Sequence, residues 1–526
     1  MNIHLQRRLK IIARQRLATL LLSGSFAITT FESALADVPH ILLHSLFDPG
    51  TNAQAGALQG YSVAVVGSIA VAGAPGIPVV EDRQAENSGV VKVYDATTGG
   101  LLHTLKNPSS PAPYNPSWEA GVDDKFGYSV AVDGTRVVVG VPHENVETTF
   151  PGYYHADAGT AYVYDLASGT PNVPVAKMNN PNPAAAAEVF GYSVAVSDTR
   201  VLVGAPHADS PALEAGSAYL YDLASATPAA PVAVLNDPSP AAGDHAGNSV
   251  AISGTRVVVG AHADDTGAQD AGSAYVYDLA SATPAVPVVT LNNPSPEESE
   301  GGNRFGGSVA VSGPLVAIGT PFDGANVGKA YAYNFGSATP SVPVAALTNP
   351  SPAVADWFGW SVSVSGKWVV VGAPQDDTGG SDAGIAYIYD FASAMPTAPV
   401  TTLNNPNPAV SGSFGRSIAI SGTRLVVGAP NDNAATDGGI AYVYELVSAT
   451  PTLPVATLGN PSLEGYDRFG LSVAVDGTTI IVGDPFDNTT APDRGATYVF
   501  GPSQPQTLVR PNAQHSHRRG PHRPVL

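Results

Sequence analysis

Three histidines occupy comparable places in successive copies of a repeated sequence. His143 and His207 each follow a Gly-x-Pro step, and His262 replaces the proline in the next copy. Carboxylates lie close behind all three, at Glu144, Asp209 and Asp264. An imidazole beside a carboxylate can transfer protons or bind a metal ion. Neighbouring copies place equivalent residues too far apart to share one ion unless they lie near a common axis. We therefore favour polar residues inherited with the repeat over catalytic groups.

Two loops of nearly identical sequence are rich in aspartate. They contain Asp264, Asp265 and Asp270 in one copy and Asp376, Asp377 and Asp382 in another. Carboxylates combined with backbone carbonyls are ligands for Ca²⁺, so these six are the candidate metal residues. The competing interpretation, which we favour, is a solvated series of Asx turns. Apart from such a Ca²⁺, the sequence predicts no cofactor.

Aromatic residues gather in two neighbouring long loops. One loop holds Tyr114 and Trp118, and the other holds Phe150, Tyr153 and Tyr154. Aromatic side chains exposed together on one rim would bind a glycan or a protein, so we take these five as candidate ligand-binding residues. The alternative is that they cover a hydrophobic gap between irregular repeats. A further group, Trp357, Trp360 and Trp368, is expected in the core.

These residues belong to a repeat that occurs eight times. Its pattern is F-G-x-S-V-A-V, a tight turn, V-V-V-G-A-P, a variable loop, G-x-A-Y-V-Y-D and V-x-x-L-x-N-P. Its first glycine falls at Gly60, Gly127, Gly191, Gly247, Gly306, Gly359, Gly415 and Gly470. A serine follows two positions later in every copy. Self-similarity at this period indicates a repeat architecture.

Each copy predicts four short strands, which we name A to D. Strand A alternates apolar and polar residues, strand B is a continuous apolar run, and two-residue turns join them as hairpins. Strand C carries the tyrosines, which we expect to pack between sheets. Four-stranded sheets with two apolar faces are best buried by radial packing. The predicted fold is an all-β, eight-bladed β-propeller of antiparallel blades, with seven blades as the alternative.

The ends of the chain must close this ring. The segment 40–47 matches strand D, and the last copy has no full-length strand D of its own. We therefore expect the N-terminal strand to complete the last blade. The competing segment is 507–511, which has a shorter connection.

The amino-acid composition and the terminal segments limit the functions that this chain can have. The 526 residues contain no Cys, which excludes disulfides and thiolate chemistry. Residues 1–36 read as a secretory signal peptide, with basic residues before an apolar stretch. They are followed by a repeat domain at 37–503 and a basic tail at 504–526, which we expect to be disordered. The mature chain has 19 basic and 43 acidic residues, a formal charge of −24, which disfavours nucleic acid. It has no predicted membrane span.

The Phe-Gly steps and the Gly-Ala-Pro steps at 73–75, 204–206, 372–374 and 428–430 resemble the FG-GAP repeat family. The resemblance covers residues 40–503 and implies a secreted or surface β-propeller for adhesion or ligand binding, usually without catalysis. Integrin α propellers are similar but have seven blades and calcium loops between strands A and B. The tight A–B turns here lack the oxygens for Ca²⁺, so the chain is similar to the calcium-less bacterial variant.

The leading hypothesis is a secreted or cell-surface, non-enzymatic propeller that binds an extracellular protein or glycan. Its ligand would contact the face formed by the B–C and D–A loops, which vary in length and carry most of the acids. An alternative is a propeller enzyme, a hydrolase or lyase acting on extracellular polysaccharide through His143, His207 and His262. A third is a structural surface component.

Overall fold

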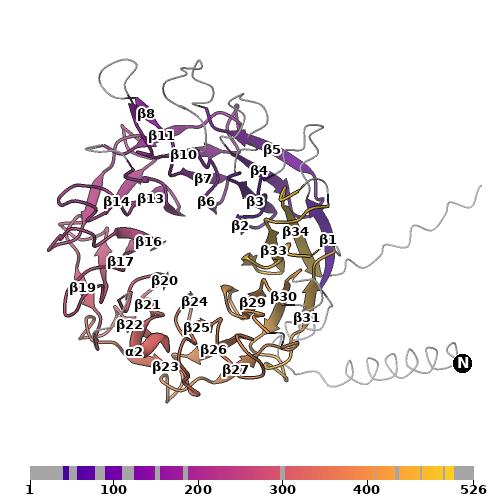
Figure 1. Ribbon diagram of the computed structural model, residues 1–526. Helices are drawn as coiled ribbons and strands as arrows, with labels where there is room; N and C mark the ends of the chain where they lie inside the picture. The colour runs from indigo at the N-terminus through magenta and orange to yellow at the C-terminus, as the bar shows by residue number, and fades with distance from the viewer. Residues whose placement is uncertain are drawn as a thin grey trace, which may run out of the picture.

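The computed structural model describes residues 40–46, 56–76, 89–108, 124–147, 154–181, 187–296, 302–408, 410–432, 438–461, 465–489 and 492–502. The signal peptide predicted at 1–36 and the tail at 504–526 lie outside these residues. Eight four-stranded antiparallel sheets form a ring (Figure 1). The prediction of an all-β, eight-bladed propeller is confirmed, and the seven-bladed alternative is wrong.

Every blade runs from strand A at the inside of the ring to strand D at the outside. We number the blades 1 to 8 in the order of their A strands. The A strands are β2 (Ser62–Val66), β6 (Ser129–Asp133), β12 (Ser193–Ser197), β16 (Ala246–Ser253), β20 (Ser308–Ser312), β24 (Ser361–Ser365), β28 (Ser417–Ser421) and β32 (Ser472–Asp476). The B strands are β3 (Ile69–Ala74), β7 (Arg136–Val141), β13 (Arg200–Ala205), β17 (Arg256–Ala261), β21 (Leu315–Thr320), β25 (Trp368–Ala373), β29 (Arg424–Ala429) and β33 (Thr479–Asp484).

Strands C and D complete the blades. The C strands are β4 (Val90–Asp95), β10 (Thr160–Asp165), β14 (Ser217–Asp222), β18 (Ser273–Asp278), β22 (Lys329–Asn334), β26 (Ile385–Asp390), β30 (Ile440–Glu445) and β34 (Ala496–Pro502). The D strands are β5 (Leu101–Lys106), β11 (Ala176–Asn179), β15 (Ala233–Asn236), β19 (Val289–Asn292), β23 (Ala345–Thr348), β27 (Thr401–Asn404), β31 (Ala456–Gly459) and β1 (His40–Leu46). The B–C loops add β8 (Val146–Glu147), β9 (Tyr154–His155) and the helical turn α2 (Asp323–Asn326). No helix in the described residues is long and apolar enough to cross a membrane.

The N-terminal strand closes the ring, as the sequence predicts. β1 pairs antiparallel with β34, with Leu46 opposite Thr497 and Leu42 opposite Phe500. Figure 1 shows this indigo strand lying outside the yellow C-terminal strand. The competing segment 507–511 lies outside the described residues, but β1 already holds the outer position of blade 8. The two ends of the propeller are thereby joined in one sheet.

The core lies between neighbouring blades. Strands B and C are buried on both faces, and one cluster combines Val91 and Leu105 of blade 1 with Val139 and Tyr162 of blade 2. The strand C tyrosines are buried, as predicted, and are among the largest fully buried side chains. Phe126, from a Phe-Gly step, packs against Tyr162 at 5.9 Å between ring centroids. The repeated aromatics therefore act as packing between sheets.

The Gly-x-Ser step of each copy ties one blade to the next. The serine hydroxyl donates a hydrogen bond to the carbonyl of the first repeat glycine in the following blade. At the seven junctions from blade 1 to blade 8, the pairs are Ser62 to Gly127, Ser129 to Gly191, Ser193 to Gly247, Ser249 to Gly306, Ser308 to Gly359, Ser361 to Gly415 and Ser417 to Gly470. A Cβ at Gly140 of strand B would lie 2.0 Å from the Gly191 carbonyl oxygen. This close approach requires glycine at that position.

Candidate functional site

The B–C and D–A loops lie on one face of the ring, because antiparallel strands alternate in direction. We call this the loop face. In all eight D–A loops, the residue before the Phe-Gly step, or before its equivalent, has a positive φ although it is not glycine. These residues are Leu58, Lys125, Val189, His245, Arg304, Trp357, Ser413 and Arg468. Non-glycine residues seldom adopt this conformation, so the repeat imposes it. Several of these side chains contact the B–C turn of a blade.

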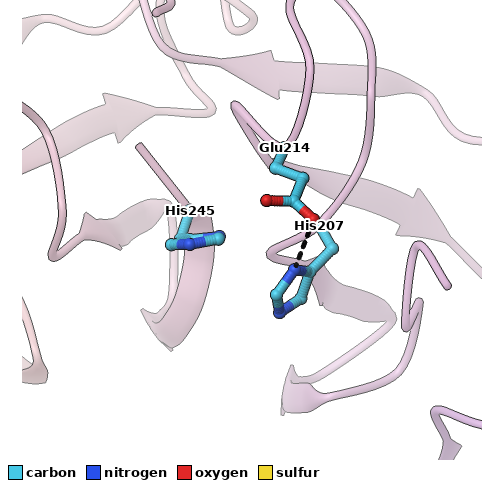
Figure 2. Close-up of side chains that lie close together, drawn as sticks. All are labelled: His207, Glu214 and His245. Atoms are coloured by element: carbon cyan, nitrogen blue, oxygen red, sulfur yellow. Dashed lines mark ion pairs between the residues drawn. The ribbon is translucent and has the colours of Figure 1, made fainter. Parts of the chain in front are cut away.

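The densest group of chemically active side chains lies at blades 3 and 4. His207 comes directly after Pro206 at the end of strand β13, Glu214 lies further along the same B–C loop, and His245 precedes strand A of blade 4. Figure 2 shows the three side chains converging. His207 Nδ1 lies 3.7 Å from Glu214 Oε1, and the rings of His207 and His245 have centroids 4.6 Å apart.

Backbone contacts fix this group in place. The His245 N–H donates to the Glu214 carbonyl at 3.2 Å, so the two loops are joined beside the side chains. The Glu214 N–H donates to Asp209 Oδ1 at 3.0 Å. His245 Nδ1 lies 3.1 Å from the Pro206 carbonyl oxygen. Each of the three side chains therefore projects from a backbone held by its neighbours.

The environment lowers the pKa of two of these histidines, His207 and His262. Burial, followed by the nearby His245, lowers the pKa of His207 despite the opposing effect of Glu214. Burial also lowers the pKa of His262 to about 4, with further contributions from His245 and Arg304. His262 stacks on His245 with ring centroids 5.6 Å apart. Neutral imidazoles have a lone pair that can accept a proton or bind a metal ion.

The structure separates the three histidines that the sequence grouped. His207 and His262 both contact His245, whereas His143 belongs to a different arrangement in blade 2. His143 Nδ1 lies 3.2 Å from Asp157 Oδ1, and its Nε2 lies 3.4 Å from the Lys125 ammonium. The sequence missed His245 and Glu214. His245 could have been noticed because it stands before Ala246 in a copy that lacks the Phe of Phe-Gly.

The six candidate metal aspartates form repeated turns. Asp264 and Asp376 are buried, and each accepts a backbone N–H two residues ahead, from Thr266 at 2.7 Å and from Thr378 at 2.8 Å. They also accept the hydroxyls of Tyr275 and Tyr387. Asp265 accepts the N–H of Asp270, and Asp377 accepts that of Asp382. These are the hydrogen bonds of the Asx-turn interpretation, and Ca²⁺ binding by these six residues stays a prediction.

A different set of carboxylates comes together in blade 8. Asp467, Asp484 and Asp487 are all buried, with carboxylate oxygens within 4.8 Å of one another. Asp467 accepts from Asn460 at 2.9 Å, and Asp487 accepts from Tyr498 at 2.6 Å. Within the described residues, neither oxygen of Asp484 has a hydrogen-bond partner. Burial and the two neighbouring charges raise the pKa of Asp484 well above its usual value.

The candidate aromatic residues are mostly outside the described part of the chain. Tyr114, Trp118, Phe150 and Tyr153 lie in segments that the structure does not describe, and Tyr154 is known only as part of the short strand β9. β9 pairs with β8 in the B–C loop of blade 2. Ligand binding by these five residues stays a prediction.

A second aromatic group emerges on the loop face of blades 5 to 7. Trp357 and Trp360 stack with centroids 5.0 Å apart, and Phe322 meets Trp357 edge-on at 5.8 Å. Arg304 lies 4.9 Å above Phe322, and Arg416 lies 4.9 Å above Trp360. We call these five residues the arginine–aromatic arc.

The arc corrects one expectation from the sequence. Trp357, Trp360 and Trp368 were expected in the core, yet all three are only partly buried. Trp357 and Trp360 lie in and just after the D–A loop, ahead of strand β24. Trp368 begins β25 and packs against the core at its edge. The expectation failed because Trp357 and Trp360 flank strand A near the loop face, whereas Trp368 begins strand B beside the A–B turn at the opposite face, and both ends of the blade remain partly open to solvent.

Comparison with known protein families identifies the repeat. The profile of the FG-GAP repeat matches residues 180–221, 232–277, 342–389, 401–444 and 456–500. A matched segment such as 232–277 contains strand D of one blade and strands A to C of the next. The sequence unit is therefore offset from the blade by one strand, which explains why an N-terminal strand D completes blade 8.

The chain was also compared with curated proteins and with solved structures. No curated protein gave a significant match. The crystal structure of BamB from Moraxella catarrhalis is similar with a TM-score of 0.47 and 12% identity, over 88% of this chain and 99% of that chain. The five profile matches and the eight-bladed ring together show that this chain is an FG-GAP repeat β-propeller protein.

Proposed function

We propose that this protein is a secreted or cell-surface, non-enzymatic binding propeller that holds an extracellular ligand on its loop face. The arginine–aromatic arc is the observation that carries the proposal. Trp, Tyr and Arg side chains dominate the binding energy of protein interfaces. The arc gathers two Trp and two Arg side chains from three blades of the ring, and Arg304 is exposed while the other three are partly exposed.

The chemistry of the arc favours an anionic glycan as the ligand. The partly exposed indole rings of Trp357 and Trp360 can pack against sugar rings, and the guanidinium groups of Arg304 and Arg416 can pair with carboxylate or sulfate groups. The whole chain carries a formal charge of −20, so these arginines are a local exception to an acidic protein. An acidic protein segment is the alternative ligand.

A glycan array probed with the purified protein tests the proposal. We expect acidic polysaccharides to bind, and Trp360→Ala and Arg416→Gln each to weaken binding about tenfold or more, which corresponds to about 1.4 kcal/mol. Lys367→Gln is the matched control, because Lys367 lies 4.4 Å above Trp368 in the same blade but on the opposite face. Equal affinities for all three variants would refute binding at the arc.

The enzyme alternative rests on the His207–Glu214 pair. A neutral imidazole near a carboxylate can act as a general base. Incubating the bound polysaccharide with the protein and measuring new reducing ends or unsaturated products separates the two functions. We expect binding without any change in polymer length, and cleavage that is lost in His207→Asn would instead establish the enzyme.

A further inference from the structure

We propose that His207, Glu214 and His245 bind one divalent transition-metal ion on the loop face, with Zn²⁺ as the representative ion. This site shares no residue with the arginine–aromatic arc, which lies on blades 5 to 7. Two imidazoles and one carboxylate form a donor set typical of zinc sites with three protein ligands and an open position.

The distances suit a metal ion after small side-chain movements. One ligand atom from each residue lies within 4.8 Å of the other two, and the His207–Glu214 pair is already at 3.7 Å. Zinc bonds of about 2.0–2.2 Å in a tetrahedron place the ligand atoms about 3.4 Å apart. The His207 and Glu214 side chains are 40% and 52% exposed, so they are free to rotate inward.

The His245 ring nitrogen that would not bind the metal ion makes the hydrogen bond expected of a metal-binding histidine. Its Nδ1 faces the Pro206 carbonyl oxygen at 3.1 Å. A carbonyl oxygen only accepts, so this contact places a proton on Nδ1, and in the neutral ring Nε2 then has the lone pair. Metal-binding histidines commonly donate their other N–H to a backbone carbonyl, which fixes both tautomer and ring orientation.

The ring of His245 has a second neighbour in blade 4. His262 stacks on it, with ring centroids 5.6 Å apart. This stacking limits the movement of the His245 ring.

The repeat explains why the three residues meet at this place. Blade 2 has the same histidine–carboxylate pair, His143 with Asp157. The position equivalent to His245 in the next D–A loop is there Val189, so blade 2 lacks the third donor. Both Val189 and His245 have a positive φ, at 50° and 57°. Blade 2 therefore offers a natural two-donor control for the three-donor site.

Calorimetric titration of the full-length protein with ZnCl₂ tests this inference. We expect His207→Asn and His245→Asn each to bind one equivalent fewer of Zn²⁺ than the wild type. Asn tolerates the positive φ of residue 245. His143→Asn is the matched control and should titrate like the wild type. Histidines elsewhere, including those in 504–526, contribute the same background to every variant.

A thermal-shift measurement supplies the second readout. A ligand that binds only the folded protein raises its melting temperature, so Zn²⁺ should stabilise the wild type and His143→Asn more than the two site variants. Glu214→Gln changes an exposed side chain, so it should fold normally and bind at least about tenfold more weakly. The inference is overturned if the three site variants match the wild type and His143→Asn in both stoichiometry and thermal shift.

Discussion

The hydroxyl of Ser472 donates a 2.7 Å hydrogen bond to the carbonyl oxygen of Gly60, 412 residues earlier in the chain. This bond is the eighth member of the series that ties each blade to the next. It crosses from blade 8 to blade 1, where the ring closes. Closure therefore uses the same contact as every other blade junction, in addition to the β1–β34 pairing.

Replacing Ser472 with alanine should weaken the closed ring. The substitution leaves the buried Gly60 carbonyl without its donor, so we expect the free energy of unfolding to fall by about 1–2 kcal/mol. Urea unfolding followed by circular dichroism measures the change. Ser225→Ala is the control, because the buried Ser225 hydroxyl has no hydrogen-bond partner among the described residues. Equal effects of the two substitutions would contradict a stabilising role for the bond.

Most of the stability that strand β1 adds to the closed ring should come from one side chain, Leu46. Leu46 is 2% exposed and packs with Ile481 and Val499, whereas Leu42 on the same strand is 38% exposed. We expect Leu46→Ala to lower the free energy of unfolding by about 2–4 kcal/mol and Leu42→Ala to lower it by less than about 1 kcal/mol. If both substitutions cost the same, β1 does not close blade 8 in this register.

The sequence was sufficient to predict the ring because each copy carries its own blade contacts. The Gly-x-Ser step recurs eight times, and every one of these serines makes the same hydrogen bond. The segment 40–47 could be assigned to blade 8 because it shares the strand D pattern. Local repetition of this kind specifies both the number of blades and the strand that completes them.

The sequence was not sufficient to predict the candidate metal site. His245 and Glu214 meet because the D–A loop of one copy packs against the B–C loop of the copy before it, and this offset has no sequence signature. The positive φ of His245 is equally hidden, because glycine is the usual marker of that conformation. The buried hydroxyl of Tyr275, which donates to Asp264, was likewise read only as packing.

Asp356 should make stability depend on pH. Burial, followed by the charges of Asp376 and Asp377, raises the pKa of Asp356 to about 6. An unfolded aspartate has a pKa near 3.9, so the folded state binds this proton more tightly. Its stabilising effect is complete below about pH 4 and is lost as the pH rises to about 6. We expect the wild type to lose stability relative to Asp356→Asn between pH 4 and 7.

Asp165 is a control, because its pKa is shifted in the opposite direction to that of Asp356. The Thr135 hydroxyl and then the Ala167 N–H lower the pKa of Asp165, so its contribution is present above the unfolded pKa and is lost as the pH falls. Thermal unfolding of the wild type and both asparagine variants, from pH 7 to well below pH 4, measures both slopes, because the contribution of Asp165 is lost only below the unfolded pKa near 3.9. Parallel curves for wild type and Asp356→Asn would show that Asp356 has an ordinary pKa.

Asp484 should be a destabilising residue at neutral pH. The other seven copies place small or apolar residues at its position, namely Ala74, Val141, Ala205, Ala261, Thr320, Ala373 and Ala429. Asp484 is fully buried, and in the part of the chain that the structure describes neither of its carboxylate oxygens has a hydrogen-bond partner. A buried polar group without such a partner costs roughly 1–3 kcal/mol. We therefore expect Asp484→Ala to raise the free energy of unfolding by roughly that amount at pH 8.

The measurement needs a chelator and a matched control. EDTA removes divalent cations that would otherwise offset the three carboxylates of blade 8, and Asp487→Ala removes a carboxylate that accepts from Thr489 and Tyr498. That control should destabilise the protein, because it breaks two hydrogen bonds. Because burial raises the pKa of Asp484, the benefit of Asp484→Ala should shrink as the pH falls and the carboxyl becomes neutral. A loss of stability in Asp484→Ala at pH 8 would show that the carboxylate is compensated in the folded protein.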